Sequence, residues 1–350
     1  MNNLGPIIIN IDSTVISSNE EKLLRNNLVG GVILFEHNYL HKKQIKKLIN
    51  DIKKVNCNIL ISVDHEGGRV QRFKDEFTKL PSFESIGRVY TKDEKLAEEI
   101  AYNSGYVAGY ELKSIGIDIN FSPVIDLSSK SNVLNERTFS STPKIVSKLA
   151  SRYITGLIDN GIIPVLKHYP GHGLVVSDTH KEICSSELSM NDIDKHMSVF
   201  KDITKDFNVP LMTSHIKFSN IDSNPVTTSS KWLKIISKDN FENRNFFISD
   251  DLEMSGVSKY HTNLTKVEIL KQALDSGCSM VIVTTMQDQT VINEKNSYQY
   301  YQTEYFDNMQ TENFKESYIN LPCFENIIYN KGSESLYHDS LSNIIENRDI

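Results

Sequence analysis

Short apolar runs alternate along this chain with longer segments in which apolar residues recur every three or four positions. The short runs, rich in β-branched residues, are typical of buried strands, and the longer segments are typical of amphipathic helices. Eight such alternations with short connections predict an α/β fold, a single-domain (β/α)8 barrel of the TIM type rather than an open sheet. The expected strands lie at residues 6–11, 31–35, 58–63, 117–121, 162–166, 209–213, 245–249 and 279–284.

Residues with capping chemistry mark the ends of several expected helices. A serine or threonine followed three residues later by an acid predicts helix starts at Ser18, Thr91 and Ser189. A glycine between an amphipathic segment and a strand predicts a helix end, because glycine adopts the left-handed backbone conformation without strain. This second pattern occurs at Gly116, Gly161 and Gly277.

The chain becomes strongly polar after Thr285. Residues 290–313 are rich in Asn, Gln, Glu and Tyr, which predicts a solvated excursion, and a final helix is expected near residues 340–347. We therefore expect the barrel to occupy residues 1–285. A polar C-terminal extension would occupy residues 286–350, with its terminal helix packed on the barrel.

Composition and charge narrow the classes of function. The hydrophobic content of 39% and the charged content of 24% are usual for a globular protein, and the net charge of −7 argues against nucleic-acid binding. The N-terminus has no basic region, and its apolar run at residues 7–9 is too short for a signal peptide or a membrane span. We expect a cytoplasmic monomer that binds neither nucleic acid nor membranes. No C-x-x-C pair occurs, so neither a disulfide framework nor a thiolate metal site is indicated by Cys57, Cys184, Cys278 and Cys323.

Ionisable residues gather in one stretch, residues 166–180, with the sequence LKHYPGHGLVVSDTH. A single histidine there would be an ordinary loop residue, but a cluster of three histidines, a lysine and an aspartate directly after an expected strand indicates a functional site. In a barrel, the C-terminal ends of the strands converge on one face. Polar residues also end four other expected strands, at residues 64–69, 122–126, 214–215 and 250–251.

A divalent-metal hydrolase is one interpretation of these residues. The spacings match no local ligand pattern, however, and Lys167 and Arg137 would add positive charge beside the cation. We therefore expect no metal ion in this site. The ligands in that interpretation would be His168, His172, His180, His215, Asp64 and Asp250.

Glycoside hydrolysis fits better, because it needs one carboxylate below an anomeric carbon and a proton donor above the glycosidic oxygen. Asp250, at the end of the rigid seventh strand, is the candidate nucleophile, whereas strand alternation would turn Asp251 away to bond locally. His180 is the candidate proton donor, because an imidazole titrates near neutral pH and Asp178 could hold its ring.

Six segments point in the same direction: LVGGVILFEHNY at 28–39, VDHEGGRVQRF at 63–73, NFSPVIDL at 120–127, NERTF at 135–139, KHYPGHGLVVSDTH at 167–180 and ISDDLEMSGV at 248–257. Taken together and in this order, they resemble glycoside hydrolase family 3, and within it the bacterial NagZ-type β-N-acetylhexosaminidases. The resemblance extends over residues 5–285.

This resemblance implies a cytoplasmic single-domain barrel that needs no cofactor. Its substrates would be N-acetylglucosaminyl-anhydromuropeptides, from which it would remove the non-reducing terminal N-acetylglucosamine during peptidoglycan recycling. The resemblance further implies a retaining mechanism, with Asp250 as the nucleophile and with Asp178 and His180 as the acid/base dyad. The sugar would be held by the residues that match the family's binding positions, Asp64, Arg72, Arg137, Lys167 and His168.

The chemistry of the binding residues agrees with these roles. Asp64 can accept hydrogen bonds from sugar hydroxyls, Arg137 and Lys167 can donate them, and Arg72 can steady Asp64. The alternative for the two arginines is a purely structural ion pair. Two features depart from the family's pattern. His65 stands where the family usually has glutamine, which is expected to alter only the hydrogen bonds of its loop, and the polar tail after Thr285 does not obviously match.

Two other functions stay open. A family-related phosphorylase or β-glucosidase is one of them, since a neutral histidine base repels an anionic acceptor less than a carboxylate would. The other is a catalytically inactive barrel that acts as a sugar sensor or an assembly partner. The presence of Asp250, Asp178 and His180 argues against this second alternative.

Overall fold

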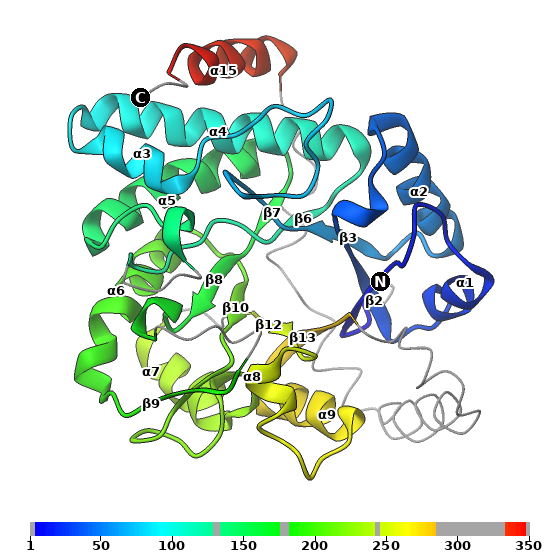
Figure 1. Cartoon of the computed structure of the whole chain (residues 1–350), viewed down its shortest axis with the longest axis vertical. Helices are drawn as coiled ribbons and strands as arrows, with labels where there is room; N and C mark the ends of the chain where they lie inside the picture. The colour runs from blue at the N-terminus through cyan, green and yellow to red at the C-terminus, as the bar shows by residue number, and fades with distance from the viewer. Residues whose placement is uncertain (1–3, 129–133, 176–181, 242–245, 285–332, 348–350) are drawn as a thin grey trace.

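The computed structural model describes residues 4–128, 134–175, 182–241, 246–284 and 333–347. Within these ranges, eight parallel strands form a barrel, and helices surround it (Figure 1). The strands are β1 (Ile7–Asn10), β2 (Val29–Leu34), β3 (Leu60–Val63), β6 (Ile119–Asn120), a fifth strand made of β7 (Ile163–Pro164) and β8 (Leu166–Tyr169), β10 (Leu211–Thr213), β12 (Phe247–Asp251) and β13 (Cys278–Val283).

The fifth strand closes the barrel. It is interrupted at Val165, and its two halves lie at opposite ends of the sheet order β7-β6-β3-β2-β1-β13-β12-β10-β8. The first half pairs with β6, and the second half pairs with β10. Because both ends of the sheet meet within one strand, the predicted (β/α)8 barrel is confirmed, and each of the eight predicted strands overlaps an observed one.

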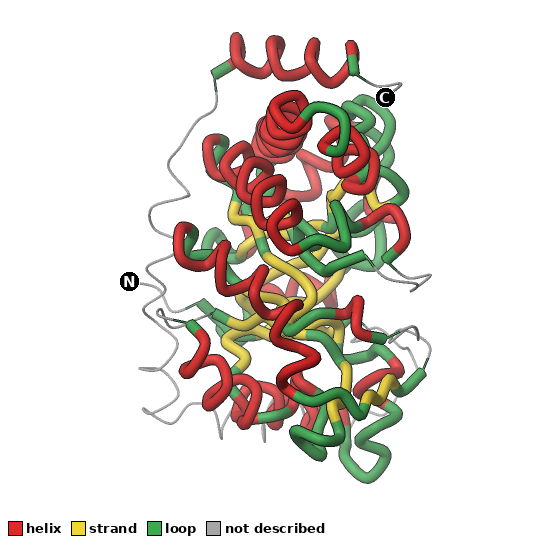
Figure 2. The backbone as a smooth tube through the Cα atoms, turned by 90° about the vertical axis from the view of Figure 1, so that its left-hand side faces the viewer, coloured by secondary structure: helices red, strands yellow, loops and turns green. Residues whose placement is uncertain are grey.

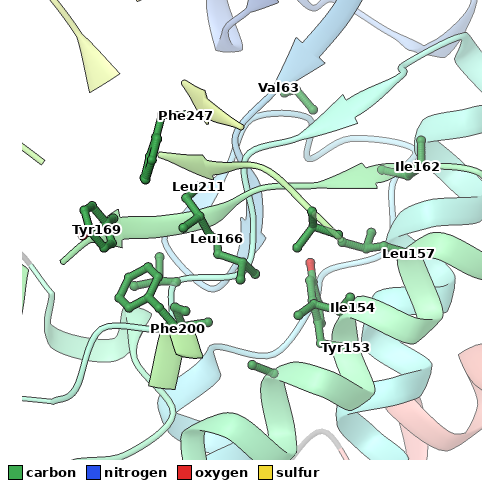
Figure 3. Close-up of a cluster of buried hydrophobic side chains, with 14 of the residues drawn as sticks. Val63, Tyr153, Ile154, Leu157, Ile162, Leu166, Tyr169, Phe200, Leu211 and Phe247 are labelled. Carbon is green, nitrogen blue, oxygen red and sulfur yellow. The ribbon is translucent and has the colours of Figure 1, made fainter. Parts of the chain in front are cut away.

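Strand alternation divides the core into two layers, because successive side chains point to opposite faces of the sheet. Ile8, Ile33 and Ile282 belong to the buried cluster of the barrel interior. The other face of the sheet packs against the helices, and Figure 3 shows part of this layer. Its labelled members include Leu166, Tyr169, Leu211 and Phe247 from the strands and Tyr153, Ile154, Leu157 and Phe200 from the helices.

Helices fill the connections between the strands. They are α1 (Ser18–Leu24), α2 (Lys42–Val55), α3 (Phe83–Tyr90), α4 (Glu94–Ile115), α5 (Pro143–Asp159), α6 (Met190–Asp206), α7 (Ser237–Asn240), α8 (Ser255–Ser258) and α9 (Lys266–Ser276). Short 3-10 turns lie at η1 (Glu36–Asn38), η2 (Asn135–Arg137), η3 (His172–Leu174) and η4 (Val226–Thr228), and a π-helical turn at η5 (Lys231–Ile236). Short strands of the loops pair as β4 (His65–Gly67) with β5 (Val70–Gln71) and as β9 (Cys184–Ser186) with β11 (Ile216–Phe218).

The predicted helix starts are correct in part. Asp192 accepts a hydrogen bond from the backbone N–H of Ser189 at 2.9 Å, so the predicted capping box of α6 is confirmed. The first helix is capped by Ser17, one residue before the predicted Ser18. The prediction at Thr91 is wrong, because that residue ends α3. The N-cap of α4 is Asp93, whose carboxylate accepts the N–H of Leu96 at 3.0 Å.

The predicted glycines at the helix ends all have a positive φ. The values are 101° at Gly116, 69° at Gly161 and 128° at Gly277. Because residues with a side chain rarely adopt this conformation, glycine allows the chain to turn directly from a helix into the next strand.

The helix α15 (Glu334–Glu346) lies against α4 on the outside of the barrel (Figures 1 and 2). The ring of Tyr337 stacks on that of Tyr110, and Ser340 donates a hydrogen bond to Asn103 at 2.9 Å. The helix begins six residues before the predicted start at residue 340. The predicted excursion at residues 290–313 lies outside the described residues.

Two expectations from the composition concern membranes and thiols. Among the helices that the structure describes, none is both long and apolar enough to cross a membrane. Cys184 and Cys278 are buried and Cys57 is exposed, and these three described cysteines form no disulfide with one another. Cys323 lies outside the described residues.

Candidate active site

The polar strand ends predicted from the sequence do meet at the C-terminal rim of the barrel. A buried ammonium group forms the centre of this site, since the side chain of Lys167 is only 2% exposed. Its Nζ lies 2.7 Å from Oδ1 of Asp64 and 2.7 Å from Oε1 of Glu66, both in the loop after β3. The two ion pairs of Lys167 therefore connect the fifth strand to the loop that follows the third.

Asp64 is held between two cations. Besides its contact with Lys167, its Oδ2 accepts a hydrogen bond from Arg72 at 3.1 Å, as expected for a residue that steadies this carboxylate. Burial alone would raise the pKa of Asp64, but Lys167 and Arg72 hold it well below its ordinary value. Asp64 is therefore an anionic acceptor at neutral pH.

Glu66 is a part of the site that the sequence did not reveal as a binding group. Arg137 grips it with two hydrogen bonds, Nε to Oε2 at 2.9 Å and a terminal nitrogen to Oε1 at 2.8 Å. Burial would raise the pKa of Glu66, yet Arg137 and Lys167 lower it to about 2. Glu66 thus orders the two cations that were predicted to bind the sugar. The available signal was its position two residues after Asp64, which strand alternation places on the same side.

A second cluster surrounds Asp126, which follows the fourth strand. This buried carboxylate lies 2.8 Å from Nδ1 of His168 and accepts the backbone N–H of His172 at 2.6 Å. Burial lowers the pKa of His172 to about 4, with a contribution from His168, whereas Asp126 and Asp250 act in the opposite direction. The candidate nucleophile Asp250 therefore contributes to the electrostatics of this cluster.

The two neighbouring aspartates of the seventh strand have different surroundings. Asp251 accepts hydrogen bonds from the hydroxyl of Thr284 and, at 3.1 Å, from the N–H of Glu253. Its own N–H donates to Oδ1 of Asp250 at 2.9 Å. Burial raises the pKa of Asp251 to about 6. Both residues are partly exposed, but Asp251 bonds locally, as expected.

His215 supports the backbone at this point. The residue is buried, and its Nε2 lies 2.9 Å from the carbonyl oxygen of Asp251. Since a carbonyl oxygen can only accept, Nε2 carries the hydrogen. The end of the seventh strand is thus tied to the sixth.

Asp178 and His180, the predicted acid/base dyad, lie outside the described residues. Their roles stay predictions. In the part of the chain that the structure describes, no group of three or more His, Cys, Asp or Glu side chains is arranged to hold a metal ion. The space between the carboxylates of Asp64 and Glu66, where a cation would sit, holds the ammonium of Lys167.

A pocket of about 600 Å³ opens beside the ion-pair network. Arg72 connects it to Asp64, and Thr284 connects it to Asp251. The pocket thus flanks the rim between the third and the seventh strands, and it is lined by Asn10, Phe35, Glu36, His37, Arg72 and Thr284.

His65, which replaces the family's usual glutamine, does not behave as expected. Its ring is fully buried between Phe73 and Phe77, and neither ring nitrogen has a hydrogen-bond partner among the described residues. Only its backbone bonds the neighbouring strand, through the side chain of Asn120 at 3.0 Å and 2.9 Å. The substitution therefore places a titratable group in an apolar core, rather than altering the loop's hydrogen bonds.

The acid stability of the protein should depend on His65. Burial lowers its pKa to about 3 in the folded chain, whereas an unfolded chain protonates histidine near its ordinary value of 6.5. Between these values the unfolded state binds more protons, so stability is lost as the pH falls below about 6.5. At pH 5 the expected loss from this residue is about 2 kcal/mol. His65→Gln should remove that part of the loss.

The measurement is the free energy of unfolding in urea at pH 7.5 and pH 5. His172 also has a lowered pKa, so His65→Gln should flatten the decline without abolishing it. The matched control is His338→Gln, at an exposed position on α15. Equal declines in the wild type and in His65→Gln would show that the ring is not buried as a neutral group.

Known proteins are similar to this chain in sequence and in fold. The model of the glycosyl hydrolase family 3 N-terminal domain matches residues 7–308. This match extends beyond Thr285, the end of the range over which the sequence resembles the family. A beta-hexosaminidase of Nitrosomonas eutropha is 37% identical over 288 residues, which cover 81% of this chain and 82% of that protein. One of Psychromonas ingrahamii is 37% identical over 282 residues, with coverages of 80% and 82%. The crystal structure of NagZ from Neisseria gonorrhoeae in complex with N-trifluoroacetyl-D-glucosamine has a TM-score of 0.81 at 26% identity and covers 99% of this chain and 98% of that one.

Proposed function

We propose that this chain, which belongs to glycosyl hydrolase family 3 and is a glycoside hydrolase of the β-N-acetylhexosaminidase class, removes terminal N-acetylglucosamine from muropeptides. The proposed reaction forms a covalent bond between the sugar and an aspartate. The observation that carries this proposal is the position of Asp250, which ends β12 across the barrel from β3, the strand that leads into Asp64 and Glu66, the two carboxylates paired with the buried Lys167. A sugar ring needs both of these features.

The strand order indicates which end of the bound sugar faces which strand. Asp64 follows β3 and Asp250 ends β12, and these two strands face each other across the barrel: β2, β1 and β13 separate them on one side, and β6, the fifth strand and β10 on the other. We place the anomeric carbon at Asp250 and the non-reducing end of the sugar at Asp64. The ion pairs of Asp64 with Lys167 and Arg72 then form the wall behind that end, which suits an enzyme that removes terminal residues.

The proposed reaction has two steps. In the first, the carboxylate of Asp250 attacks the anomeric carbon and forms a glycosyl ester, while His180 protonates the departing oxygen. In the second, His180 takes a proton from water, whose oxygen displaces the aspartate and restores the free carboxylate. Asp178 holds the imidazole ring of His180 during both steps. Two inversions at the same carbon retain the β configuration.

The physiological proposal is more specific than the chemistry. We assign N-acetylglucosaminyl-anhydromuropeptides from peptidoglycan recycling as the substrates, a cytoplasmic location and a monomeric state. The support is the family membership and the likeness to bacterial beta-hexosaminidases over most of the chain. Neither a metal nor another cofactor is part of the proposal.

The test is an assay of the full chain with 4-nitrophenyl N-acetyl-β-glucosaminide and with the anhydromuropeptide disaccharide. We expect release of N-acetylglucosamine from both, first as the β anomer, and no effect of excess EDTA. The matching β-glucoside should be a poor substrate. A sugar 1-phosphate formed only when phosphate is added would identify a phosphorylase instead. Loss of activity with EDTA and its recovery with zinc or manganese would support the metal-dependent interpretation.

A further inference from the structure

We propose that Asp126 is a positioning residue that holds His168 with its hydrogen on Nδ1, so that Nε2 accepts a hydrogen bond from one hydroxyl of the bound sugar. The inference rests on the proposed function, because it concerns how the same site recognises its sugar substrate. According to this proposal, the enzyme recognises one sugar hydroxyl as a hydrogen-bond donor and not only as an acceptor.

The first step is that both oxygens of the Asp126 carboxylate accept hydrogen bonds. Its Oδ1 accepts the backbone N–H of His172 at 2.6 Å. Its Oδ2 faces both the backbone N–H of His168 at 3.2 Å and the ring Nδ1 of His168 at 2.8 Å. Each backbone N–H can only donate, so both carboxylate oxygens act as acceptors.

The second step assigns the ring hydrogen. A carboxylate that accepts from every side has no hydrogen of its own to give, so the hydrogen between Asp126 and His168 must lie on Nδ1. The pKa of Asp126 agrees with this assignment. Burial would raise it, but the hydrogen bond from the His168 ring and that from the backbone N–H of His172 help to bring it below its ordinary value.

The third step concerns the other ring nitrogen. Nε2 of His168 makes no hydrogen bond within the described part of the chain, and the side chain keeps 7% of its surface exposed. In a neutral ring whose hydrogen is on Nδ1, this atom is an acceptor. The adjacent residue, Lys167, can only donate. A hydroxyl that lies between them can accept from the ammonium and donate to the ring.

This arrangement has a consequence for specificity. A hydroxyl both donates and accepts, whereas a fluorine substituent can accept weakly but cannot donate. At the position that meets His168, a fluoro sugar should therefore be as poor a substrate as a deoxy sugar, because each leaves Nε2 without a partner. At a hydroxyl that only accepts from Lys167 or Arg137, fluorine should be the milder change.

The direct test is nitrogen NMR of the full-length chain labelled with 15N in histidine. Long-range proton–nitrogen spectra distinguish the two neutral forms of the ring from the doubly protonated form, and a His168→Gln spectrum assigns the resonance. We expect the neutral form with its hydrogen on Nδ1 at pH 7.5. The opposite neutral form, or a doubly protonated ring, would overturn the proposal, and this measurement needs no Asp126 variant to fold.

The functional test compares deoxy and fluoro versions of the aryl glucosaminide at positions 3, 4 and 6. Asp126→Asn should lower kcat/KM on the parent substrate by about 10- to 100-fold, as for loss of a hydrogen bond to a charged partner. On the analogue altered at the hydroxyl that meets His168, the same substitution should have a much smaller effect, because the lost contact is already absent. Equal losses on all substrates would mean that Asp126 only maintains the fold.

The matched control is Asp118→Asn, at the opposite end of the same strand. Asp118 also accepts two hydrogen bonds, from Lys53 at 2.8 Å and from the N–H of Ile61 at 2.9 Å, but it lies before β6 rather than after it. This variant should keep the wild-type pattern of discrimination. If the wild type does not cleave the aryl glucosaminide at all, the proposed function fails. If it does so while the ring hydrogen lies on Nε2, only the present inference fails.

Discussion

Asp250→Ala should yield a folded barrel that has lost at least about 1000-fold in turnover, because the substitution removes the nucleophile and leaves the core intact. Asp250 is partly exposed at the rim, so its loss creates no buried cavity. The measurement is kcat on an aryl N-acetylglucosaminide, together with circular dichroism and thermal unfolding. A 2-fluoro sugar that traps the intermediate should label Asp250 in the wild type and label nothing in the variant.

Asp251→Asn is the matched control for this result. Asp251 is the adjacent carboxylate, but it accepts hydrogen bonds from Thr284 and from the N–H of Glu253 and does not face the sugar in the proposed geometry. Its replacement should therefore change stability more than chemistry. If a folded Asp250→Ala keeps activity within tenfold, a barrier change of only about 1.4 kcal/mol, the nucleophile lies elsewhere, and Asp251 or Glu66 becomes the candidate.

The barrel could be predicted from the sequence because its strands are buried on both faces. Such strands appear as continuous apolar runs, for example residues 7–9 and 280–283, and their predicted positions need only be right to within a few residues. The interruption of the fifth strand at Val165 could not be predicted in this way. The apolar pattern continues through it, although the two halves pair with different neighbouring strands.

The error at Thr91 has a local cause. Thr91 and Asp93 are both capping residues, and the acid three residues after Thr91 made it the better match to the capping box. In the structure Thr91 belongs to the end of the preceding helix, where its hydroxyl donates to the carbonyl of Arg88. Asp93 is the residue left to accept the first free N–H of α4.

Some residues of the site could be predicted from the sequence, and others could not. Motif positions gave Asp64, Arg72, Arg137 and Lys167, and the structure joins all of them in one ion-pair network. Glu66 links two of these cations, but its position two residues after Asp64 was its only signal in the sequence, because its partners lie 71 and 101 positions away. The burial of His65 was missed for the same reason. The apolar contacts of its ring come from Phe73 and Phe77, which fold back over it from the next loop.

The acid/base assignment gives the second large effect. His180→Ala should slow substrates with poor leaving groups, such as the natural disaccharide, far more than aryl glycosides, whose departing phenolate needs little protonation. General-acid assistance contributes roughly 100- to 10,000-fold, so the contrast between the two substrate types should be of that size. The measurement is kcat/KM for a series of aryl glucosaminides of increasing leaving-group pKa, together with the disaccharide.

Asp178→Ala should show a milder form of the same contrast, since it removes the partner that orients the ring and leaves the proton donor in place. The matched control is His338→Ala, which changes an exposed histidine of α15 on the outside of the barrel and should leave both substrate types unaffected.

A histidine that only binds sugar predicts a different result. It would weaken both substrate types by a similar factor, mainly through KM, because lost ground-state binding does not depend on the leaving group. Equal losses for His180→Ala across the series would therefore reject the dyad. Glu66 would be a poor replacement for it, because Arg137 and Lys167 keep the pKa of Glu66 at about 2 and leave it no proton to donate.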